Sequence, residues 1–260
     1  MRIKKIQNIL KKKNKKPIVC LTAYSKNIAE ILDNYCDIIL VGDSLGSVLY
    51  GMNSTKRVSL DMMINHSISV KKGVKKSLLV VDMPYGTYRN KKIALNNARK
   101  ILNKTKCDAV KLEGGKSIIN IVKYLTSHKI SVMGHIGLLP QTSINFKLRG
   151  KKLYQQRNIF EDAVALSNSG VFAIVIECVV ESLAKKITNS IPIPTIGIGA
   201  SKHCDGQVLV IDDMLGLNNF HPKFVKQYAN VKKIMENCVK NYCKDVKRRR
   251  FPSSKYVYKL

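Results

Sequence analysis

Five consecutive apolar segments of the sequence contain or end in side chains that can do chemistry. Four of these side chains are carboxylates in or just after a run of Val, Ile and Leu, and three of them, Asp43, Asp82 and Glu113, come from successive segments. Acids are almost never buried without a partner, so packing alone explains them poorly. Carboxylate oxygens with no His or Cys among them are the ligands that a hard cation prefers, and we expect a Mg²⁺ site here.

The other polar residues of the same segments extend this chemistry. A bound Mg²⁺ can chelate a 2-keto acid and stabilise the enolate that forms when the adjacent carbon loses a proton. Lys111 can then neutralise the remaining charge of the substrate, and Glu177 can act as the general base. Ser44 and His135 complete the set of polar residues at these positions.

Each of these residues also has a plain structural explanation. Asp43 and Ser44 could cap the helix that follows them. Asp82 could stabilise the turn after it, and His135 could be a buried histidine with satisfied hydrogen bonds. The glutamates are harder to explain in this way, because they lie inside or at the end of apolar runs. Taken together, the residues favour one functional site.

The elements that must position these side chains are short apolar runs separated by longer mixed segments. Continuous apolar runs of this length are typical of strands buried on both faces of a parallel sheet. We expect eight strands, at Ile18–Tyr24, Asp37–Asp43, Leu78–Pro84, Ala109–Gly114, Ser131–Gly137, Phe172–Cys178, Pro194–Ala200 and Gln207–Met214. Eight βαβ units can close into a (β/α)₈ barrel, the TIM barrel, and an open doubly wound sheet is the alternative.

In such a barrel the carboxyl ends of the strands converge on one mouth, where active sites lie. The expected helices between the strands are Lys26–Tyr35, Ser59–Gly73, Ala94–Lys104, Ser117–His128, Phe160–Asn168 and Ser182–Thr188. Residues 222–260 read as one or two helices and then a tail. We therefore expect one barrel domain over residues 1–260, with a basic C-terminal tail from about residue 247.

The chain of 260 residues carries a net charge of +29, spread over many short lysine clusters. Such a charge can indicate nucleic-acid binding, but few of the clusters contain the aromatic side chains that a stacking surface needs. Lys, Asn and Ile, whose codons are A/T-rich, are abundant together. A compositional bias at exposed positions is the preferred explanation, and no specific nucleic-acid partner is expected.

Other patterns narrow the class of protein. The seven cysteines are scattered and form no CxxC pair, which is typical of free thiols in a reducing cytoplasm. No apolar run reaches the roughly 18 residues of a membrane span, and residues 1–16 lack the apolar stretch of a secretory signal. GxGxxG and P-loop patterns are absent. The GIG turn at 197–199 fits either phosphate binding or close backbone approach.

At the predicted strand ends the sequence resembles the ketopantoate hydroxymethyltransferase family, also called the 3-methyl-2-oxobutanoate hydroxymethyltransferases. Each matching segment is moderately specific alone, and the joint match over nearly the whole chain is highly specific. The segments are LTAYS (21–25), DIILVGDSLG (37–46), VVDMPYGTY (80–88), DAVKLEGG (108–115), VMGHIGLLPQ (132–141), AIVIECV (173–179), PTIGIGA (194–200), CDGQVLV (204–210), DMLG (213–216) and PKFVK (222–226).

The resemblance implies a (β/α)₈ barrel with bound Mg²⁺. It also implies transfer of a hydroxymethyl group from 5,10-methylenetetrahydrofolate to 3-methyl-2-oxobutanoate, a step of pantothenate biosynthesis. Members of the family are similar in forming cytoplasmic homo-oligomers, often decamers. Matched residue by residue, the motifs imply that Asp43, Asp82 and Glu113 surround the metal. They imply that the keto acid is contacted by Asp43, Ser44, Asp82 and Lys111. Glu177 matches the proton acceptor, and His135 matches a residue of the pocket wall.

The sequence departs from the family pattern in three places. After residues 143–145, the segment Phe146–Gly150 is shorter than the usual loop and lacks its Gly-Gly-Tyr, which bears on folate affinity or turnover. Val180 stands where a proline is usual, and Ser201 replaces a frequent glycine. Two other functions stay open from the residues alone. They are a related Mg²⁺-dependent keto-acid lyase or mutase on the same barrel, and a basic nucleic-acid-binding protein.

Overall fold

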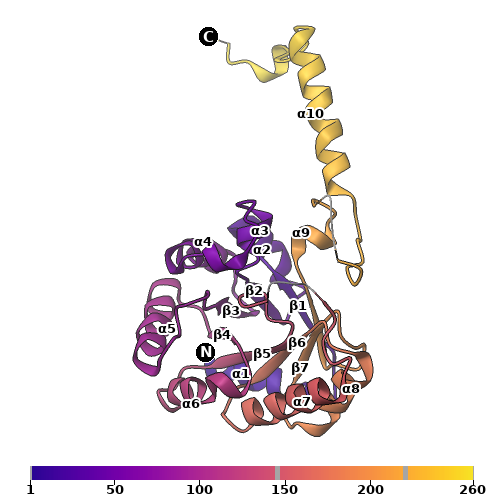
Figure 1. The fold of residues 1–260 in the computed structure, drawn as a ribbon. Helices are drawn as coiled ribbons and strands as arrows, with labels where there is room; N and C mark the ends of the chain where they lie inside the picture. The colour runs from indigo at the N-terminus through magenta and orange to yellow at the C-terminus, as the bar shows by residue number, and fades with distance from the viewer. Residues whose placement is uncertain (1, 144–146, 219–221, 260) are drawn as a thin grey trace. The chain divides into compact units, whose positions relative to one another are not determined.

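A computed structural model describes residues 2–143, 147–218 and 222–259. The chain divides into two compact units, residues 1–210 and residues 211–260. The first unit holds eight parallel strands that close into a barrel in sequence order (Figure 1). They are β1 (Ile18–Thr22), β2 (Ile38–Val41), β3 (Leu78–Asp82), β4 (Ala109–Glu113), β5 (Val132–Gly137), β6 (Ala173–Glu177), β7 (Thr195–Ile198) and β8 (Gly206–Leu209). The predicted TIM barrel is confirmed.

Helices connect the strands and surround the barrel (Figure 1). They are α2 (Lys26–Leu32), α3 (Leu45–Val48), α4 (Leu60–Gly73), α5 (Lys91–Thr105), α6 (Ile119–Ser127), α7 (Leu153–Ser167) and α8 (Glu181–Ser190), with short 3₁₀ turns at η1 (Thr55–Arg57) and η2 (Lys116–Ile118). Local capping sets several of the starts. Ser59 accepts a hydrogen bond from the Met62 N–H at the start of α4, and Asn90 does the same for Ile93 in α5.

Two predicted boundaries are clearly wrong, and one helix was missed. The eighth predicted strand extends to Met214, but the chain leaves β8 after Leu209 and residues 211–214 form the helix α9 (Ile211–Met214). Asp212 and Asp213 stand in the first turn of α9, where carboxylates favour a helix. Helix α7 begins at Leu153, well before the predicted Phe160. The N-terminal helix α1 (Arg2–Leu10) was not predicted, because its lysines hide the apolar spacing of Ile3, Ile6 and Ile9.

Helix α1 contributes to the core at the amino-terminal end of the strands. Its Ile9 is buried in the same apolar cluster as inward-facing residues of the barrel, among them Ile18, Cys20, Ile38 and Val80. The lysines of this segment pair with acids that come directly before strands. Lys5 Nζ lies 3.4 Å from Asp108, Lys12 Nζ 2.5 Å from Asp37, and Lys13 Nζ 2.8 Å from Asp205.

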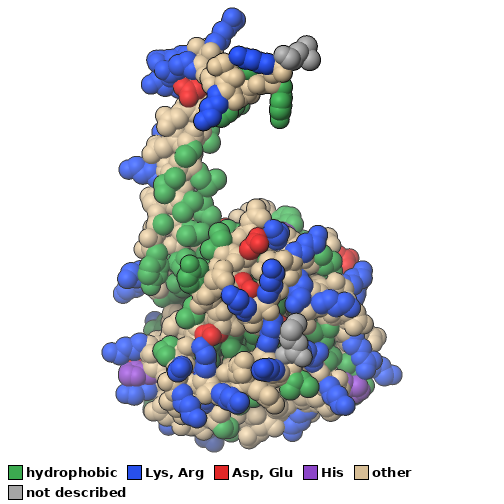
Figure 2. Space-filling view, turned by 180° about the vertical axis from the view of Figure 1, so that it is seen from behind, with side chains coloured by type: hydrophobic (Ala, Val, Ile, Leu, Met, Phe, Trp, Pro, Cys, Tyr) green, Lys and Arg blue, Asp and Glu red, His purple; other side chains and the backbone are tan. Residues whose placement is uncertain are grey.

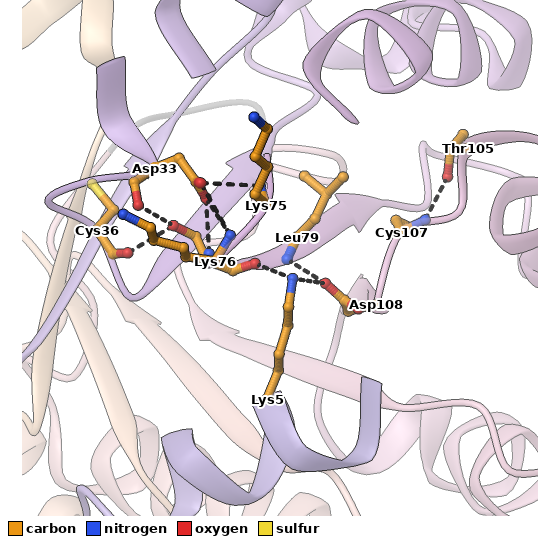
Figure 3. A network of polar contacts seen from close by, with 10 residues as sticks. Lys5, Asp33, Cys36, Lys75, Lys76, Leu79, Thr105, Cys107 and Asp108 are labelled. Atoms are coloured by element: carbon orange, nitrogen blue, oxygen red, sulfur yellow. Dashed lines mark hydrogen bonds and ion pairs between the residues drawn. The ribbon is translucent and has the colours of Figure 1, made fainter. Parts of the chain in front are cut away.

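The acids at this end also satisfy backbone N–H groups of neighbouring segments. Asp108 accepts from the Leu79 N–H of β3, and Asp33 accepts from the N–H groups of Lys75, Lys76 and Ser77 (Figure 3). Lys5 reaches the same network and donates to the Ser77 carbonyl at 2.7 Å. These carboxylates therefore have structural partners, and they hold the N-terminal segment to the base of the barrel.

The second unit contains α9, the helix α10 (Val231–Lys247) and the short turn η3 (Ser254–Tyr256). No residue of α10 is buried. Figure 2 shows hydrophobic side chains along this helix and Lys and Arg spread over the surface. The single barrel domain over residues 1–260 with a basic tail from about residue 247 stays a prediction. No helix in the described part of the chain is long and apolar enough to cross a membrane.

Candidate active site

The polar residues singled out in the sequence gather at the carboxyl ends of β2 to β6. Asp82, Glu113 and Glu177 are the last residues of β3, β4 and β6. The parallel register places Lys111 beside Asp82 and His135 beside Glu113 on neighbouring strands. This arrangement accounts for the contacts among side chains that lie far apart in the sequence.

A continuous line of charged contacts runs from β3 to β6. Lys111 Nζ lies 3.1 Å from Asp82 Oδ1 and 3.3 Å from His135 Nδ1. The same Nδ1 lies 3.5 Å from Glu113 Oε1, and His135 Nε2 lies 3.2 Å from Glu177 Oε2. Four of these five side chains are almost fully buried, whereas the Glu177 side chain is 13% exposed. Glu177 is therefore the most accessible member of the line.

Asp43 and Ser44 lie just after β2 and join this group through different partners. The Asp43 backbone N–H donates to Asp82 Oδ2 at 3.1 Å. Ser44 occupies the N-cap position of α3, but its side chain makes no capping hydrogen bond. Instead, Ser44 Oγ lies 2.8 Å from the Tyr24 hydroxyl. The simple capping explanation of this residue does not describe its side chain.

Burial and charge shift the ionisation of the acids at β2 and β3. Burial, together with the neighbouring carboxylates of Asp82 and Glu113, raises the pKa of Asp43 to about 8. Burial also raises the pKa of Asp82, although Lys111 opposes the shift. Burial disfavours the charged form of Lys111, but the three carboxylates outweigh it and raise the pKa of this ammonium. Lys111 is thus a permanent cation among acids that repel one another.

Glu113 and His135 form the second charged group. Burial opposes ionisation of Glu113, but contact with His135 and the charge of Lys111 lower its pKa. For His135, burial and the charge of Lys111 oppose protonation. Contacts with Glu113 and Glu177 prevail and raise the pKa of the imidazole to about 9. His135 is therefore an ion-paired part of the site rather than an isolated core histidine.

Two further residues belong to the site and were not predicted from the sequence. Gln141, in the loop after β5, donates from Nε2 to Asp43 Oδ2 at 2.8 Å, and its backbone N–H donates to Glu113 Oε2 at 3.0 Å. The Tyr88 hydroxyl donates to Gln141 Oε1. Both residues lie in segments that carry the family resemblance, which was the only available signal, since neither follows an apolar run directly.

Part of the predicted metal site fits a hard cation. Asp82 Oδ1 is buried and receives no hydrogen bond from the described residues, although Lys111 Nζ lies 3.1 Å away. Mg²⁺ commonly binds through one or two carboxylates together with water and substrate oxygens, so Asp43 and Asp82 suit it. Within residues 2–143, 147–218 and 222–259, no three His, Cys, Asp or Glu side chains are grouped so that they could hold a metal ion. The three-carboxylate site that includes Glu113 stays a prediction.

The other segments weighed in the sequence lie outside this cluster. A Cβ on Gly197 would approach Gln207 and Cys204 side-chain atoms at 3.0 to 3.2 Å, which agrees with close packing as the reason for this glycine. The predicted change in the loop after Asn145 falls partly on residues 144–146, which lie outside the described residues.

Comparisons with known proteins agree over nearly the full length. A family model described as ketopantoate hydroxymethyltransferase matches residues 2–254. A 3-methyl-2-oxobutanoate hydroxymethyltransferase of Pelagibacter ubique is 60% identical over 255 residues, which cover 98% of this chain and 99% of the relative. A protein of the same name from Rhizobium etli is 51% identical over 252 residues, covering 95% of this chain and 92% of the relative.

Solved structures of similar fold are much more distant in sequence. A phosphonopyruvate hydrolase in complex with oxalate and Mg²⁺ is similar with a TM-score of 0.62 and 9% identity, over 98% of this chain and 92% of the other. A 2,3-dimethylmalate lyase of the PEP mutase/isocitrate lyase superfamily gives a TM-score of 0.63 and 9% identity, over 98% and 88%. At such low identity the similarity shows the fold alone.

Proposed function

Because the chain belongs to the ketopantoate hydroxymethyltransferase family, we propose that it uses 5,10-methylenetetrahydrofolate and water to hydroxymethylate 3-methyl-2-oxobutanoate. The products are 2-dehydropantoate and tetrahydrofolate. The chain is an enzyme of the transferase class. The observation that carries the detailed mechanism is the line of contacts from Asp82 through Lys111 and His135 to Glu177. It puts a cation and a reachable carboxylate at one mouth of the barrel.

The charge of the site supports a divalent cation. Four carboxyl groups lie at this mouth, and Lys111 and His135 are their cationic partners among the described residues. A keto acid would add a further negative charge to this group of acids, and a divalent cation would offset it. Asp43 and Asp82 would hold Mg²⁺, with Glu113 close behind them. When bound, the cation polarises the keto carbonyl and stabilises the enolate oxygen.

Side chains of the site would bind the substrate carboxylate and remove the proton from C3. The Lys111 ammonium can balance the substrate carboxylate, and the Ser44 hydroxyl can orient it. Glu177 is the base that takes the C3 proton, since it is the exposed end of the charged line. His135 Nε2 lies 3.2 Å from the Glu177 carboxylate, so the imidazole is placed to orient this base.

The enolate carbon formed in this way attacks the methylene carbon that the folate supplies. The new bond is the C–C bond of the hydroxymethyl group, the methylene carbon leaves the folate nitrogens, and water provides the hydroxyl oxygen. Both C–N bonds of the methylene carbon break, so each of the two nitrogens gains a hydrogen. The proton held by Glu177 passes to one nitrogen, and the water that supplies the hydroxyl group gives its other hydrogen to the second nitrogen.

A turnover assay tests this proposal directly. The full chain is incubated with 3-methyl-2-oxobutanoate and methylenetetrahydrofolate, with and without EDTA, and 2-dehydropantoate is measured. We expect product only when Mg²⁺ is available. Release of smaller fragments from a 2-keto acid or its hydroxylated relatives would instead favour the lyase or mutase alternative. DNA binding that persists near physiological salt would favour the nucleic-acid alternative.

We also propose that the enzyme is a cytoplasmic homo-oligomer. The scattered cysteines are all free thiols, which suits a reducing compartment. Helix α10 supports self-association, because Ile234, Met235, Val239 and Tyr242 are each more than half exposed along it. Because these residues are one, four and three positions apart, their side chains lie along one face of the helix. They form an exposed apolar stripe that a second copy of the chain could bury. Sedimentation of the wild type and of Val239→Glu tests this, and a monomeric wild type would contradict it.

A further inference from the structure

The side-chain amide of Gln141 connects two loops at the mouth of the barrel. The residue is 1% exposed. Its Nε2 donates to Asp43 Oδ2 at 2.8 Å and to the Met83 carbonyl at 3.0 Å. Its Oε1 accepts a hydrogen bond from the Tyr88 hydroxyl. Both amide hydrogens and the amide oxygen are therefore engaged.

These partners allow only one orientation of the amide. A backbone carbonyl has no hydrogen to donate, and a carboxylate accepts, so the group facing Met83 and Asp43 must be the NH₂. The hydroxyl of Tyr88 can donate to the oxygen on the other side. A flipped amide would place oxygen against oxygen at both contacts of Nε2. The orientation is thus fixed by chemistry and by Tyr88.

The backbone of the same residue reaches a second carboxylate. The Gln141 N–H donates to Glu113 Oε2 at 3.0 Å. One residue of the loop after β5 therefore binds a carboxylate that follows β2 and another that ends β4. Since these acids repel each other, each needs a donor that fixes its direction.

We propose that Gln141 is a positioning residue that fixes the Asp43 carboxylate so that its Oδ1 stays available to a divalent cation. By engaging Oδ2, the amide leaves Oδ1 as the oxygen that can reach a ligand. Tyr88 acts through Gln141, because its hydroxyl holds the amide in the required orientation. The role in turnover rests on the proposed function, whereas the role in cation binding does not.

A purely structural role for Gln141 makes a different prediction. If the amide only fastened the loop after β5, its loss would lower the melting temperature and leave the cation affinity of the folded protein unchanged. A positioning residue has the opposite signature. Partners that orient metal ligands typically change metal affinity or activity about 10- to 100-fold when they are replaced.

The experiment is a titration of the purified full chain with Mn²⁺, followed by calorimetry, with no substrate present. Gln141→Met keeps the length of the side chain and removes its hydrogen bonds, and we expect Mn²⁺ binding to weaken about 10- to 100-fold. The matched control is Gln156→Met. That amide donates to the Gly150 carbonyl at 2.9 Å in the same stretch of chain but touches no acid of the site. We expect the control to bind Mn²⁺ like the wild type.

Tyr88→Phe keeps the proposal testable if Gln141→Met does not fold. It removes a single hydroxyl, and we expect a weakening of about 2- to 10-fold, the scale of one hydrogen bond. Wild-type Mn²⁺ affinity in folded Gln141→Met, an equal loss in Gln156→Met, or no saturable binding by the wild type would each overturn the proposal. Failure of the turnover assay with these Mn²⁺ results intact would overturn the proposed reaction alone.

Discussion

Replacing Glu177 by Gln isolates the proton-transfer role of this carboxylate. The amide has nearly the same shape, and its oxygen can still accept a hydrogen bond from His135 Nε2, which lies 3.2 Å from the carboxylate in the wild type. The replacement therefore keeps the contact that orders the end of β6. It removes only the ability to take the C3 proton of the keto acid.

The expected loss follows from what the carboxylate contributes. General base catalysis commonly accelerates a step about 10²- to 10⁴-fold, which corresponds to about 3 to 5 kcal/mol of barrier. His135→Asn should cost less, because it leaves the base in place and removes its charged partner. Such a hydrogen bond contributes about 1.5 to 3 kcal/mol, or about 10- to 100-fold in rate.

Exchange of the C3 proton with solvent measures this step without folate. The full chain is mixed with 3-methyl-2-oxobutanoate and Mg²⁺ in D₂O, and loss of the C3 proton signal is followed by NMR. We expect exchange to be slower in Glu177→Gln than in His135→Asn, with keto-acid binding largely kept in both. Exchange at the wild-type rate in Glu177→Gln would refute the assignment, and a greater loss in His135→Asn would move the base to the imidazole.

Three further outcomes follow from the same structure. Asp82→Ala should abolish Mg²⁺-dependent turnover while circular dichroism shows a folded chain, and normal activity would remove Asp82 from the site. Lys13→Met should lower the free energy of unfolding by about 3 kcal/mol and the melting temperature by about 6 to 12 °C. The reason is that the side chain of its partner Asp205 is only 3% exposed. A loss of unfolding free energy below about 1 kcal/mol would mean that this ion pair contributes no more than a surface pair. In the metal-free protein, urea denaturation should show stability falling from about pH 6.5 to 9. The pKa of His135 is raised to about 9, so its contribution to stability is complete below the usual pKa of 6.5 and is lost as the pH rises through 9. The pKa of Asp43 is raised to about 8 by burial, so ionisation of this carboxyl also lowers stability as the pH rises. Stability that rises over this pH range would contradict both assignments.

The barrel could be predicted because each strand corresponds to a separate apolar run in the sequence. Each of the eight runs contains the strand that the structure shows, apart from Gly206, which begins β8 one residue early. The end of the last run was not predictable from hydropathy, since Ile211 and Met214 are as apolar as a strand residue. The Asp212–Asp213 pair was the contrary signal, and it stands in the first turn of α9.

The acids of the site were predictable, but their partners were not. Topology places the ends of β2 to β6 at one mouth, and no register is needed for that conclusion. The contact of Lys111 with Asp82 depends on the register of β3 against β4. Gln141 depends on the path of a loop, and its amide reaches Asp43 over 98 residues of sequence. The types and spacing of residues in the sequence do not determine the register between strands or the path of a loop.

The two ends of the barrel show why residue type alone could not separate structure from function. At the amino-terminal end, Asp108 and Asp205 each accept backbone N–H groups and pair with a lysine of the N-terminal segment. The negative charge of each of these acids is therefore balanced by its own lysine. At the carboxyl end, four carboxylates share Lys111 and His135, and the pKa of Asp43 rises to about 8 as a result of burial and this crowding. A fold that only needed packing would lose stability by keeping such a surplus. Under the proposed function, a divalent cation would offset this surplus and would allow an anionic keto acid to bind. The unbalanced charge is therefore the physical feature that distinguishes this end as the site of chemistry.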